Sequence, residues 1–210
     1  MPRGHFIVVE GLEGAGKSTA LATIKQYFIK HNLDFIMTRE PGGTIRGEAI
    51  RTIIKEVVES EPLEPQAELL LFYAARVQLL RQVILPALQR GSWVLADRFE
   101  LSTLAYQGGG RKLDPHFITQ LSRFCLGDFK PDLMIFLDIP PHIGLQRVRK
   151  RGKFDRIEQE SLEFFNCVYE CYHQHIRTLN NVVIIDAAQP LVSVKNAIRE
   201  TLDLYLRHDV

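Results

Sequence analysis

Residues 6–18, Phe6-Ile-Val-Val-Glu-Gly11-Leu-Glu-Gly-Ala-Gly16-Lys17-Ser18, decide the fold of this 210-residue chain. They join a short apolar run to the pattern G-x-x-x-x-G-K-[ST], and a helical pattern follows. Glycines let backbone N–H groups surround a phosphate, and the helix N-terminus adds its dipole. We expect a P-loop in which Lys17 reaches the β- and γ-phosphates of ATP and Ser18 holds Mg²⁺. The expected nucleotide contacts are Gly11, Glu13, Gly14, Ala15, Gly16, Lys17, Ser18 and Thr19.

The rest of the chain alternates short apolar runs with longer amphipathic ones. We expect strands at Phe6–Glu10, Asp34–Thr38, Trp93–Ala96, Leu133–Asp138 and Val182–Asp186. Helices are expected at about 17–31, 45–58, 66–90, 115–126, 141–151, 158–179 and 190–207. This alternation predicts an α/β fold of three layers, a five-stranded parallel sheet with helices on both faces, as in P-loop NTPases. Because no linker rich in Gly, Ser or Pro interrupts it, we expect a single domain over residues 1–210.

Composition narrows the choice of partners and of compartment. The chain has 26 Lys and Arg against 25 Asp and Glu, a net charge of +1, which argues against a globally basic nucleic-acid binder. Its three cysteines are too few for a disulfide scaffold and fit a reducing compartment. No apolar run approaches the roughly 18–20 residues that span a bilayer. We therefore expect a cytoplasmic protein with neither a membrane nor a nucleic-acid partner.

The residues that flank the later strands indicate a phosphoryl donor site rather than a hydrolase. The N-K-x-D pattern with which GTPases usually recognise guanine is absent. The strand Leu133–Asp138 is followed by Ile139-Pro140-Pro141, so no glutamate stands ready there to activate water. The P-loop is thus expected to face a second substrate.

Polar residues after the third strand are candidates for binding that acceptor. Asp97 and Arg98 end this strand, where ligands of parallel sheets bind. Asp97 is a candidate Mg²⁺ ligand and Arg98 a candidate phosphate ligand, with a plain Asp97–Arg98 salt bridge as the alternative. Ser102, Thr103 and Gln107 have the hydrogen-bonding groups that a base edge requires. The triple glycine 108–110 would approach a flat ligand or form a mobile loop, and a polar surface loop is the alternative.

Phe72 and Arg76 stand four residues apart and so share one helix face. A ring beside a guanidinium suits stacking on a base and binding of its carbonyl oxygen. The apolar neighbours of Phe72 equally suit a core position.

The segment 147–156 carries six cations in ten residues: Arg147, Arg149, Lys150, Arg151, Lys153 and Arg156. A nucleic-acid patch, a solvated basic face and a lid over the ATP phosphates would each explain them. The variable P-loop residues 12–15 contain no Arg or Lys, so a transition-state cation must come from elsewhere. This favours a lid over about 147–158, with Arg149 and especially Arg151 as catalytic candidates. Asp155 is expected to cap the helix that follows.

Taken together, these motifs resemble the thymidylate kinase family in its bacterial form. The likeness covers Phe6–Ser18, Thr38–Thr44, Phe72–Arg76, Asp97–Arg111 and Leu137–Glu160, in the family's order and spacing. It implies transfer of the γ-phosphoryl group of ATP to dTMP, with Mg²⁺, by a homodimer that uses the apolar face of the helix after Ser60. An ordinary core face is the alternative role of this helix. One departure is Phe99, where the family usually has Tyr or His after Asp-Arg.

The resemblance also implies roles for single residues. Phe72 would stack on thymine and Arg76 would bind its O4 edge, while Arg98 would grip the acceptor phosphate and act in catalysis with Lys17. Arg147 would lie on adenine. The remaining implied substrate contacts are Arg51 to the acceptor phosphate, Glu13 to the 3′-hydroxyl, Tyr106 against the 2′ position, and Ser102, Thr103 and Gln107 around the base.

Three other functions remain open at this point. A kinase for another nucleoside monophosphate or a deoxynucleoside would share the P-loop and lid and differ in the acceptor pocket. A nucleic-acid-associated ATPase would use the basic segment 147–153 as its binding patch. A degenerate nucleotide-binding scaffold is the third, against which the intact Lys17, Ser18, Asp97 and Arg98 argue.

Overall fold

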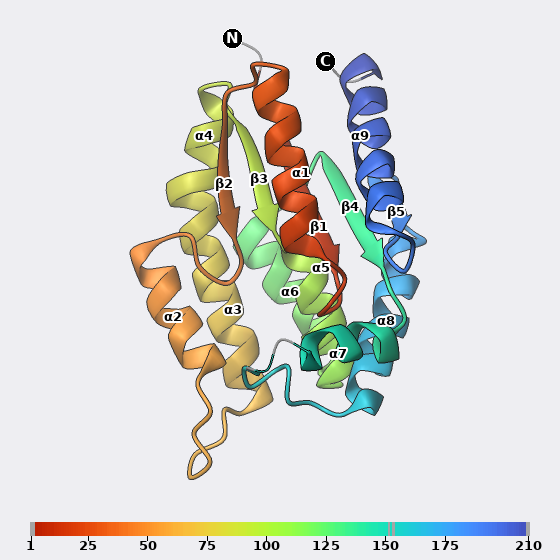
Figure 1. Cartoon of the computed structure of the whole chain (residues 1–210). Helices are drawn as coiled ribbons and strands as arrows, with labels where there is room; N and C mark the ends of the chain where they lie inside the picture. The colour runs from red at the N-terminus through yellow and green to blue at the C-terminus, as the bar shows by residue number, and fades with distance from the viewer. Residues whose placement is uncertain (1–2, 151, 153, 209–210) are drawn as a thin grey trace.

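The computed structural model describes residues 3–150, 152 and 154–208. Five strands alternate with helices along the chain (Figure 1). In order, the elements are β1 (Phe6–Gly11), α1 (Lys17–Lys30), β2 (Phe35–Arg39), α2 (Ile45–Lys55), α3 (Pro65–Leu79), η1 (Leu80–Ile84), α4 (Leu85–Gln89), β3 (Trp93–Asp97), α5 (Glu100–Thr103), η2 (Leu104–Gly110), α6 (Pro115–Leu126), β4 (Leu133–Asp138), α7 (Pro141–Arg149), α8 (Leu162–Ile176), β5 (Val182–Asp186) and α9 (Leu191–His208). The two η segments are π-helical turns that continue an α-helix.

The strands form one parallel sheet in the order β2-β3-β1-β4-β5. β1 is central, and its Val8 pairs with Ala96 of β3 on one side and with Met134 of β4 on the other. Every residue of β1 is buried, as expected for a strand covered on both faces. The predicted α/β class and the five-stranded parallel sheet are confirmed.

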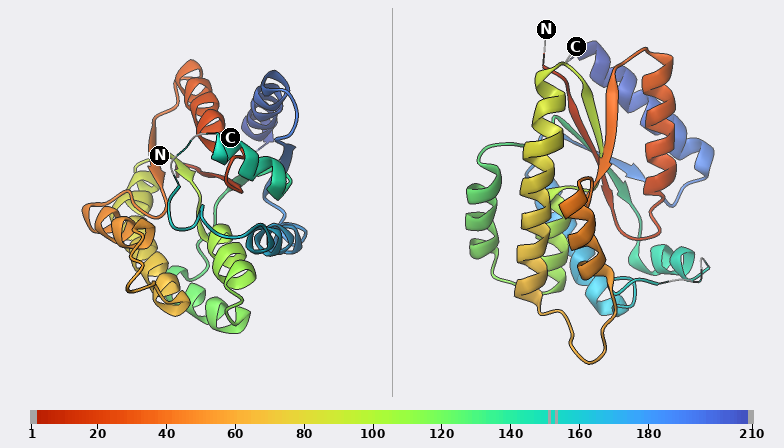
Figure 2. Two further views of the ribbon diagram at one scale, coloured as in Figure 1. Left: turned by 60° about the horizontal axis from the view of Figure 1, so that its bottom comes forward. Right: turned by 90° about the vertical axis from the view of Figure 1, so that its left-hand side faces the viewer.

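Helices cover both faces of this sheet (Figure 2). The right-hand view shows α1 and α9 on one side and α3, α4 and α6 on the other. Because the strands are parallel, their arrowheads in Figure 1 point toward the same edge. The P-loop after β1 and the polar residues after β2 and β3 therefore meet at this edge, which is where ligands of such sheets bind.

Residues 100–110 differ most from the sequence-based expectation. They form α5 and η2, a continuous helical stretch, rather than a polar surface loop or a mobile glycine loop. A Cβ added at Gly109 would lie 2.5 Å from Cys171 Cβ and 2.9 Å from the Cys167 carbonyl oxygen. One added at Gly110 would lie 2.4 Å from the Phe164 ring. These two glycines thus let η2 pack closely against α8, and they do not serve a flat ligand.

We predict that Gly109→Ala lowers the free energy of unfolding by about 1–3 kcal/mol, because overpacking forces η2 and α8 apart. Gly108→Ala is the matched control, since its added Cβ would meet only Ile118 Cδ1, at 3.4 Å. Urea unfolding of both variants measures the difference. Equal stability of the two variants would contradict the packing role of Gly109.

The lid end also differs from expectation. The helix predicted from residue 158 begins at Leu162, and its N-cap is Ser161, whose hydroxyl accepts from the Phe164 N–H at 3.1 Å. Asp155 therefore does not cap this helix. Its Oδ1 accepts from the N–H groups of Ile157 and Glu158 at 3.1 and 3.0 Å, so it caps a separate turn before α8.

Among the described residues, one helical stretch, Pro65–Gln89, is long and apolar enough to cross a membrane by length and composition alone. The sequence analysis did not anticipate such a stretch. Its Leu69, Tyr73 and Leu79 are buried in the core, and core helices of soluble proteins pass the same test.

Candidate active site

The phosphate loop occupies the turn between β1 and α1. Lys17 is the first residue of α1, and its Nζ donates to the carbonyl oxygens of Gly11 and Leu12 at 2.9 and 2.8 Å. Gly16 precedes the helix with a φ of 92°, a left-handed conformation that disfavours other residues. The open N–H groups at this helix start suit an anion. Burial, with a smaller contribution from Arg98, lowers the pKa of Lys17 to about 8.

The loop also packs against the helix that leads into the lid. A Cβ on Gly14 would lie 2.1 Å from the carbonyl oxygen of Gly144 in α7, and one on Gly144 would lie 2.4 Å from that of Glu13. Two backbones thus touch directly, and both positions require glycine. Gly144 was not singled out by the sequence analysis, because its contact is about 130 residues distant in the chain.

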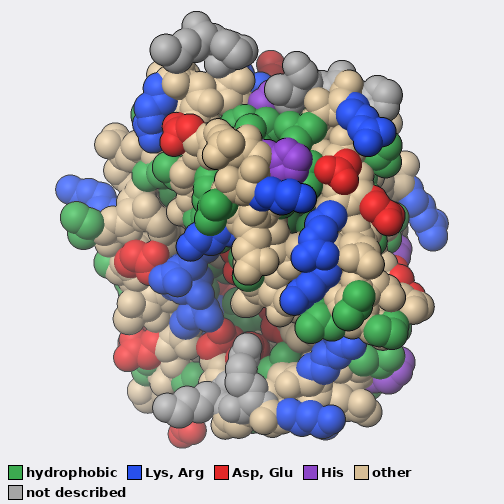
Figure 3. Space-filling view, turned by 45° about the horizontal axis from the view of Figure 1, so that its top comes forward, with side chains coloured by type: hydrophobic (Ala, Val, Ile, Leu, Met, Phe, Trp, Pro, Cys, Tyr) green, Lys and Arg blue, Asp and Glu red, His purple; other side chains and the backbone are tan. Residues whose placement is uncertain are grey.

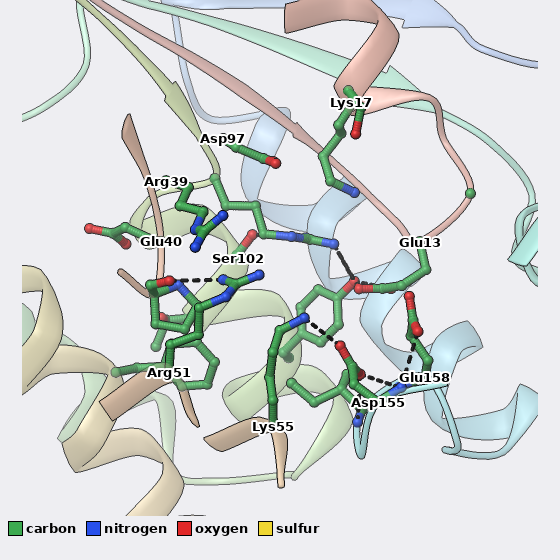
Figure 4. A pocket seen from close by; sticks show the side chains of 18 of the residues that line it. Glu13, Lys17, Arg39, Glu40, Arg51, Lys55, Asp97, Ser102, Asp155 and Glu158 are labelled. Carbon is green, nitrogen blue, oxygen red and sulfur yellow. Dashed lines mark hydrogen bonds and ion pairs between the residues drawn. The ribbon is translucent and has the colours of Figure 1, made fainter. Parts of the chain in front are cut away.

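A cleft of about 340 Å³ opens beside the loop and is lined from β2, α2, α3, β3, α5 and η2. Figure 3 shows Lys and Arg side chains on both sides of a hollow in this face of the molecule. Figure 4 shows Lys17 and Asp97 on one side of the cleft, with Arg51, Lys55 and Asp155 opposite. Of the predicted site residues, the cleft brings together Glu13, Gly14, Gly16, Lys17, Ser18, Arg51, Phe72, Asp97, Arg98, Ser102, Thr103, Tyr106 and Gln107.

Arg98 lies at the centre of this cleft with a φ of 68°. Its guanidinium pairs with Glu13 at 2.7 Å and donates to the hydroxyls of Ser102 and Tyr172 at 3.1 and 3.2 Å. Tyr106 donates to the other Glu13 oxygen. The surrounding acidic and phenolic groups raise the pKa of Arg98 against the opposing effect of burial, so its charge is fixed.

Asp97, in contrast, is not the partner of Arg98. Among the described residues, its Oδ1 is a buried side-chain oxygen without a hydrogen-bond partner. Arg98 pairs with Glu13 instead, and no ion pair joins Asp97 to Arg98 among the described residues, so the plain salt bridge is not formed. A buried acceptor that lines the same cleft as Ser18 suits a hard cation, for which oxygen ligands are preferred.

The ring of Phe72 lines the acceptor end of the cleft, whereas Arg76, the other predicted base ligand, is buried and is not among the lining residues. Phe72 is half-buried and lines the cleft instead of the core. Arg76 is 1% exposed, pairs with Glu40 at 2.7 Å and donates to Thr103 Oγ1 at 2.7 Å. Its Nη1 has no hydrogen-bond partner within the part of the chain that the structure describes. Burial raises the pKa of Glu40 to about 7, although Arg76 opposes this shift.

Several carboxylates of the site were missed by the sequence analysis. Glu10, fully buried at the end of β1, accepts from the N–H groups of Phe99 and Ser102 and from the hydroxyls of Ser102 and Tyr172. It thereby fixes the turn that carries Arg98. The available signal was one glutamate in an otherwise apolar strand.

Residues of α2 close the cleft from the side of the lid. Arg51 donates to the Pro41 carbonyl oxygen at 2.8 Å, and Lys55 pairs with Asp155 at 2.6 Å (Figure 4). Burial lowers the pKa of Arg51. The second pairing ties α2 to the predicted lid segment.

A second hollow, of about 240 Å³, lies on the other side of the P-loop. It is lined by Gly14, Ala15, Gly16, Thr19, Arg147 and residues 187–198 in part. Arg147 donates to the carbonyl oxygens of Ala187 and Gly14 at 3.0 and 3.3 Å. Arg149 ends α7 and is exposed, while Arg151 lies outside the described residues.

A phosphate loop between two hollows, one of them lined by Arg51, Arg98 and the Phe72 ring, is the arrangement of a P-loop phosphotransferase. A model of the thymidylate kinase family matches residues 9–198. A thymidylate kinase of Legionella pneumophila strain Corby is 52% identical over 207 residues, which cover 99% of this chain and 98% of the relative. The thymidylate kinase of Legionella pneumophila strain Paris is 51% identical over 207 residues, which again cover 99% of this chain and 98% of the relative. The chain belongs to the thymidylate kinase family.

Proposed function

We propose that the protein transfers the γ-phosphoryl group of ATP to dTMP in this cleft, giving ADP and dTDP. The observation that carries the proposal is the joint lining of one cleft by Lys17 of the P-loop and by Arg98 and Phe72 of the acceptor side. ATP lies along the P-loop toward the second hollow, where Arg147 borders the adenine.

Catalysis requires positioning and charge rather than a general base. A phosphomonoester is largely dianionic at pH 7 because its second pKa is about 6, so a dTMP phosphate oxygen is already a nucleophile. Arg98 and Arg51 orient that phosphate. Lys17 exchanges its two carbonyl partners for phosphate oxygens of ATP, and stabilises the charge of the moving phosphoryl group.

Mg²⁺ would be held by the Ser18 hydroxyl and by Asp97, either directly or through water. When bound, it neutralises charge between the β- and γ-phosphates. The described residues contain no group of three or more His, Cys, Asp or Glu that could hold a metal. This agrees with the usual mode of Mg²⁺ binding, in which one or two protein ligands supplement water and phosphates.

Thymine lies against Phe72 with its O4 edge toward Nη1 of Arg76, which has no partner among residues 3–150, 152 and 154–208. Ser102, Thr103 and Gln107 border the rest of the base. Glu13 approaches the 3′-hydroxyl of the deoxyribose. Tyr106, which is hydrogen-bonded to Glu13, occupies the space that a ribose 2′-hydroxyl would need.

The segment 147–158 acts as a lid within one kinase domain. Arg149 and Arg151 close over the ATP phosphates and exclude water, which would otherwise hydrolyse ATP, while Arg156 binds Glu68. We predict that Arg149→Ala and Arg151→Ala each lower kcat by about 10–100-fold, and raise the KM for dTMP far less, because their contacts form in the transition state. Steady-state kinetics with varied dTMP measure both constants. A raised KM with unchanged kcat would make either residue a binding residue.

The pKa of Lys17 predicts a pH dependence. Lys17 acts as a cation, so activity that depends on it is lost as the pH rises through its pKa, about 8 in the free enzyme. We expect kcat/KM for ATP to fall about tenfold per pH unit above this value. The bound phosphates raise the pKa, so kcat should stay level to a higher pH. Arginine at this position keeps its charge, so Lys17→Arg should remove the fall of kcat/KM at high pH. A kcat/KM for ATP that stays level to pH 10 in the wild type would contradict the role of Lys17 as the cation.

We also propose that the protein is cytoplasmic and forms a homodimer. Exposed apolar side chains support the dimer, among them Leu70 of α3 at 52% and Phe124 of α6 at 87%. Sedimentation velocity at micromolar concentration tests it, and a monomer throughout would refute it.

The reaction is tested by ADP release with Mg²⁺-ATP across dTMP, dUMP, UMP, CMP, AMP, GMP, thymidine and single-stranded DNA. Strong preference for dTMP, with dTDP identified as product, is the expected result. Turnover with another acceptor alone would refute the assigned thymine pocket. ADP release that only DNA stimulates would refute the role of segment 147–158 as a lid.

A further inference from the structure

Glu68 of α3 is a buried carboxylate that the proposed mechanism does not use. Its side chain is 1% exposed. It accepts from Gln107 Nε2 at 2.6 Å, from two nitrogens of Arg111 at 3.3 Å, and from Arg156 Nη2. Buried charges are costly unless they are paired, and here two guanidinium groups and an amide share one carboxylate. Of these partners, Gln107 also lines the acceptor end of the cleft.

The partners of Glu68 decide which way the Gln107 amide points. An amide has a donating NH₂ end and an accepting oxygen, and its orientation follows from the hydrogen-bond network. A carboxylate that faces Arg111 and Arg156 accepts hydrogen bonds and donates none. The NH₂ end of Gln107 must therefore face Glu68. Its Oε1 is left as the end available to a ligand, so the cleft presents a hydrogen-bond acceptor at this point.

A donor lies one helical turn from Gln107, where Arg76 Nη2 contacts Thr103 Oγ1 at 2.7 Å. Arg76 lies two helical turns beyond Glu68 along α3, and its Nη1 has no partner among the described residues. Thymine presents an acceptor, O4, next to a donor, N3–H, and an Arg donor beside a Gln acceptor matches this order. Cytosine presents the reverse order, an amino donor next to the N3 acceptor, and so mismatches both groups.

We propose that Glu68 is a specificity-determining positioning residue, which locks the Gln107 amide with its oxygen toward the N3–H of thymine and thereby excludes cytosine. The inference rests on the proposed function, since it assumes that the base binds between Phe72 and Gln107. Glu68 contacts no substrate. It acts through Gln107, and Arg111 and Arg156 hold it in its accepting state.

Glu68→Gln tests whether Glu68 fixes the orientation of the Gln107 amide. The new amide will turn its oxygen to the two arginines, leaving its NH₂ toward Gln107, whose own amide then rotates and presents NH₂ to the cleft. We expect the ratio of kcat/KM for dTMP to that for dCMP to fall by about tenfold or more, since a buried mismatched pair is costly. The KM for ATP should change by less than about twofold, because the P-loop is untouched.

Glu160→Gln is the matched control. Glu160 is the other carboxylate partner of Arg111, and it makes no contact with Gln107. The same charge is removed beside the same arginine, yet the ratio should stay within about threefold of wild type. An equal fall of the ratio in both variants would mean that loss of charge or rigidity, rather than the lock, is responsible, and would overturn the proposal.

A double-mutant cycle separates action through Gln107 from a direct role. In a Gln107→Leu background, Glu68→Gln should leave the dTMP-to-dCMP ratio unchanged, because the amide that it orients is gone. A further fall of the ratio in that background would overturn the proposal.

An NMR measurement on the wild type keeps the proposal testable if Glu68→Gln does not fold. The side-chain amide of Gln107, labelled with ¹⁵N and assigned by its loss in Gln107→Leu, should exchange slowly with solvent both without and with dTMP. Fast exchange in the free enzyme would show that no lock exists before the base binds. Failure of the wild type to phosphorylate dTMP would instead refute the proposed function, whatever the amide does.

Discussion

Lys17→Ala is expected to reduce turnover by about 10³-fold or more while the protein stays folded. Lys17 is the one P-loop side chain with a cationic group at the phosphates, since residues 12–15 supply none. In the free enzyme its ammonium only bridges the loop carbonyls of Gly11 and Leu12. When the ammonium is removed, these two carbonyl oxygens bind water instead, so the protein loses little stability. The moving phosphoryl group, in contrast, loses its nearest fixed positive charge.

Lys25→Ala is the matched control for this variant. Lys25 lies on the same helix, is exposed and has no role in the site. Thermal unfolding should place both variants within a few degrees of wild type, since neither change affects the core. ADP release should then separate them by about three orders of magnitude. Turnover near the wild-type rate in a folded Lys17→Ala protein would contradict the assignment of residues 11–18 as the phosphate loop.

The sheet could be predicted because its strands are short, mostly apolar and separated by helical patterns. Buried runs such as Leu133–Asp138 have few other uses in a chain of this length, and the observed strand has the predicted bounds. The P-loop motif likewise could be recognised locally, since its pattern of glycines and lysine lies within eight residues, although the contact of Gly14 with Gly144 could not. Features that are determined within one element were therefore accessible from sequence.

Features that depend on contacts between distant elements were not accessible. The glycines 108–110 are a loop signal when read locally, but packing against α8 makes them part of a helix. Glu68 stands in an apolar helical pattern, and its partners Gln107 and Arg156 are 39 and 88 residues away. A pattern within one helix cannot reveal which charges the fold will bring to it, so the polar network behind the acceptor site came only from the structure.

Arg98→Gly is the second change with a large expected effect, and it separates activity from stability. Arg98 has a φ of 68°, a left-handed conformation that costs a non-glycine residue about 1 kcal/mol or more. Glycine removes that strain together with the guanidinium. We therefore expect Arg98→Gly to be more stable than Arg98→Ala by about 1 kcal/mol, as measured by urea unfolding.

Both variants should nevertheless lose about 10³-fold in kcat/KM for dTMP, because the acceptor phosphate loses its bidentate partner. The loss also leaves Glu13 without its ion pair, so negative charge faces the incoming phosphate instead of positive charge. Arg98→Lys should recover only part of the activity, since an ammonium cannot contact Glu13, Ser102 and a phosphate with one planar fork. If Arg98→Gly keeps activity within tenfold of wild type, Arg98 serves the fold and another cation holds the acceptor phosphate.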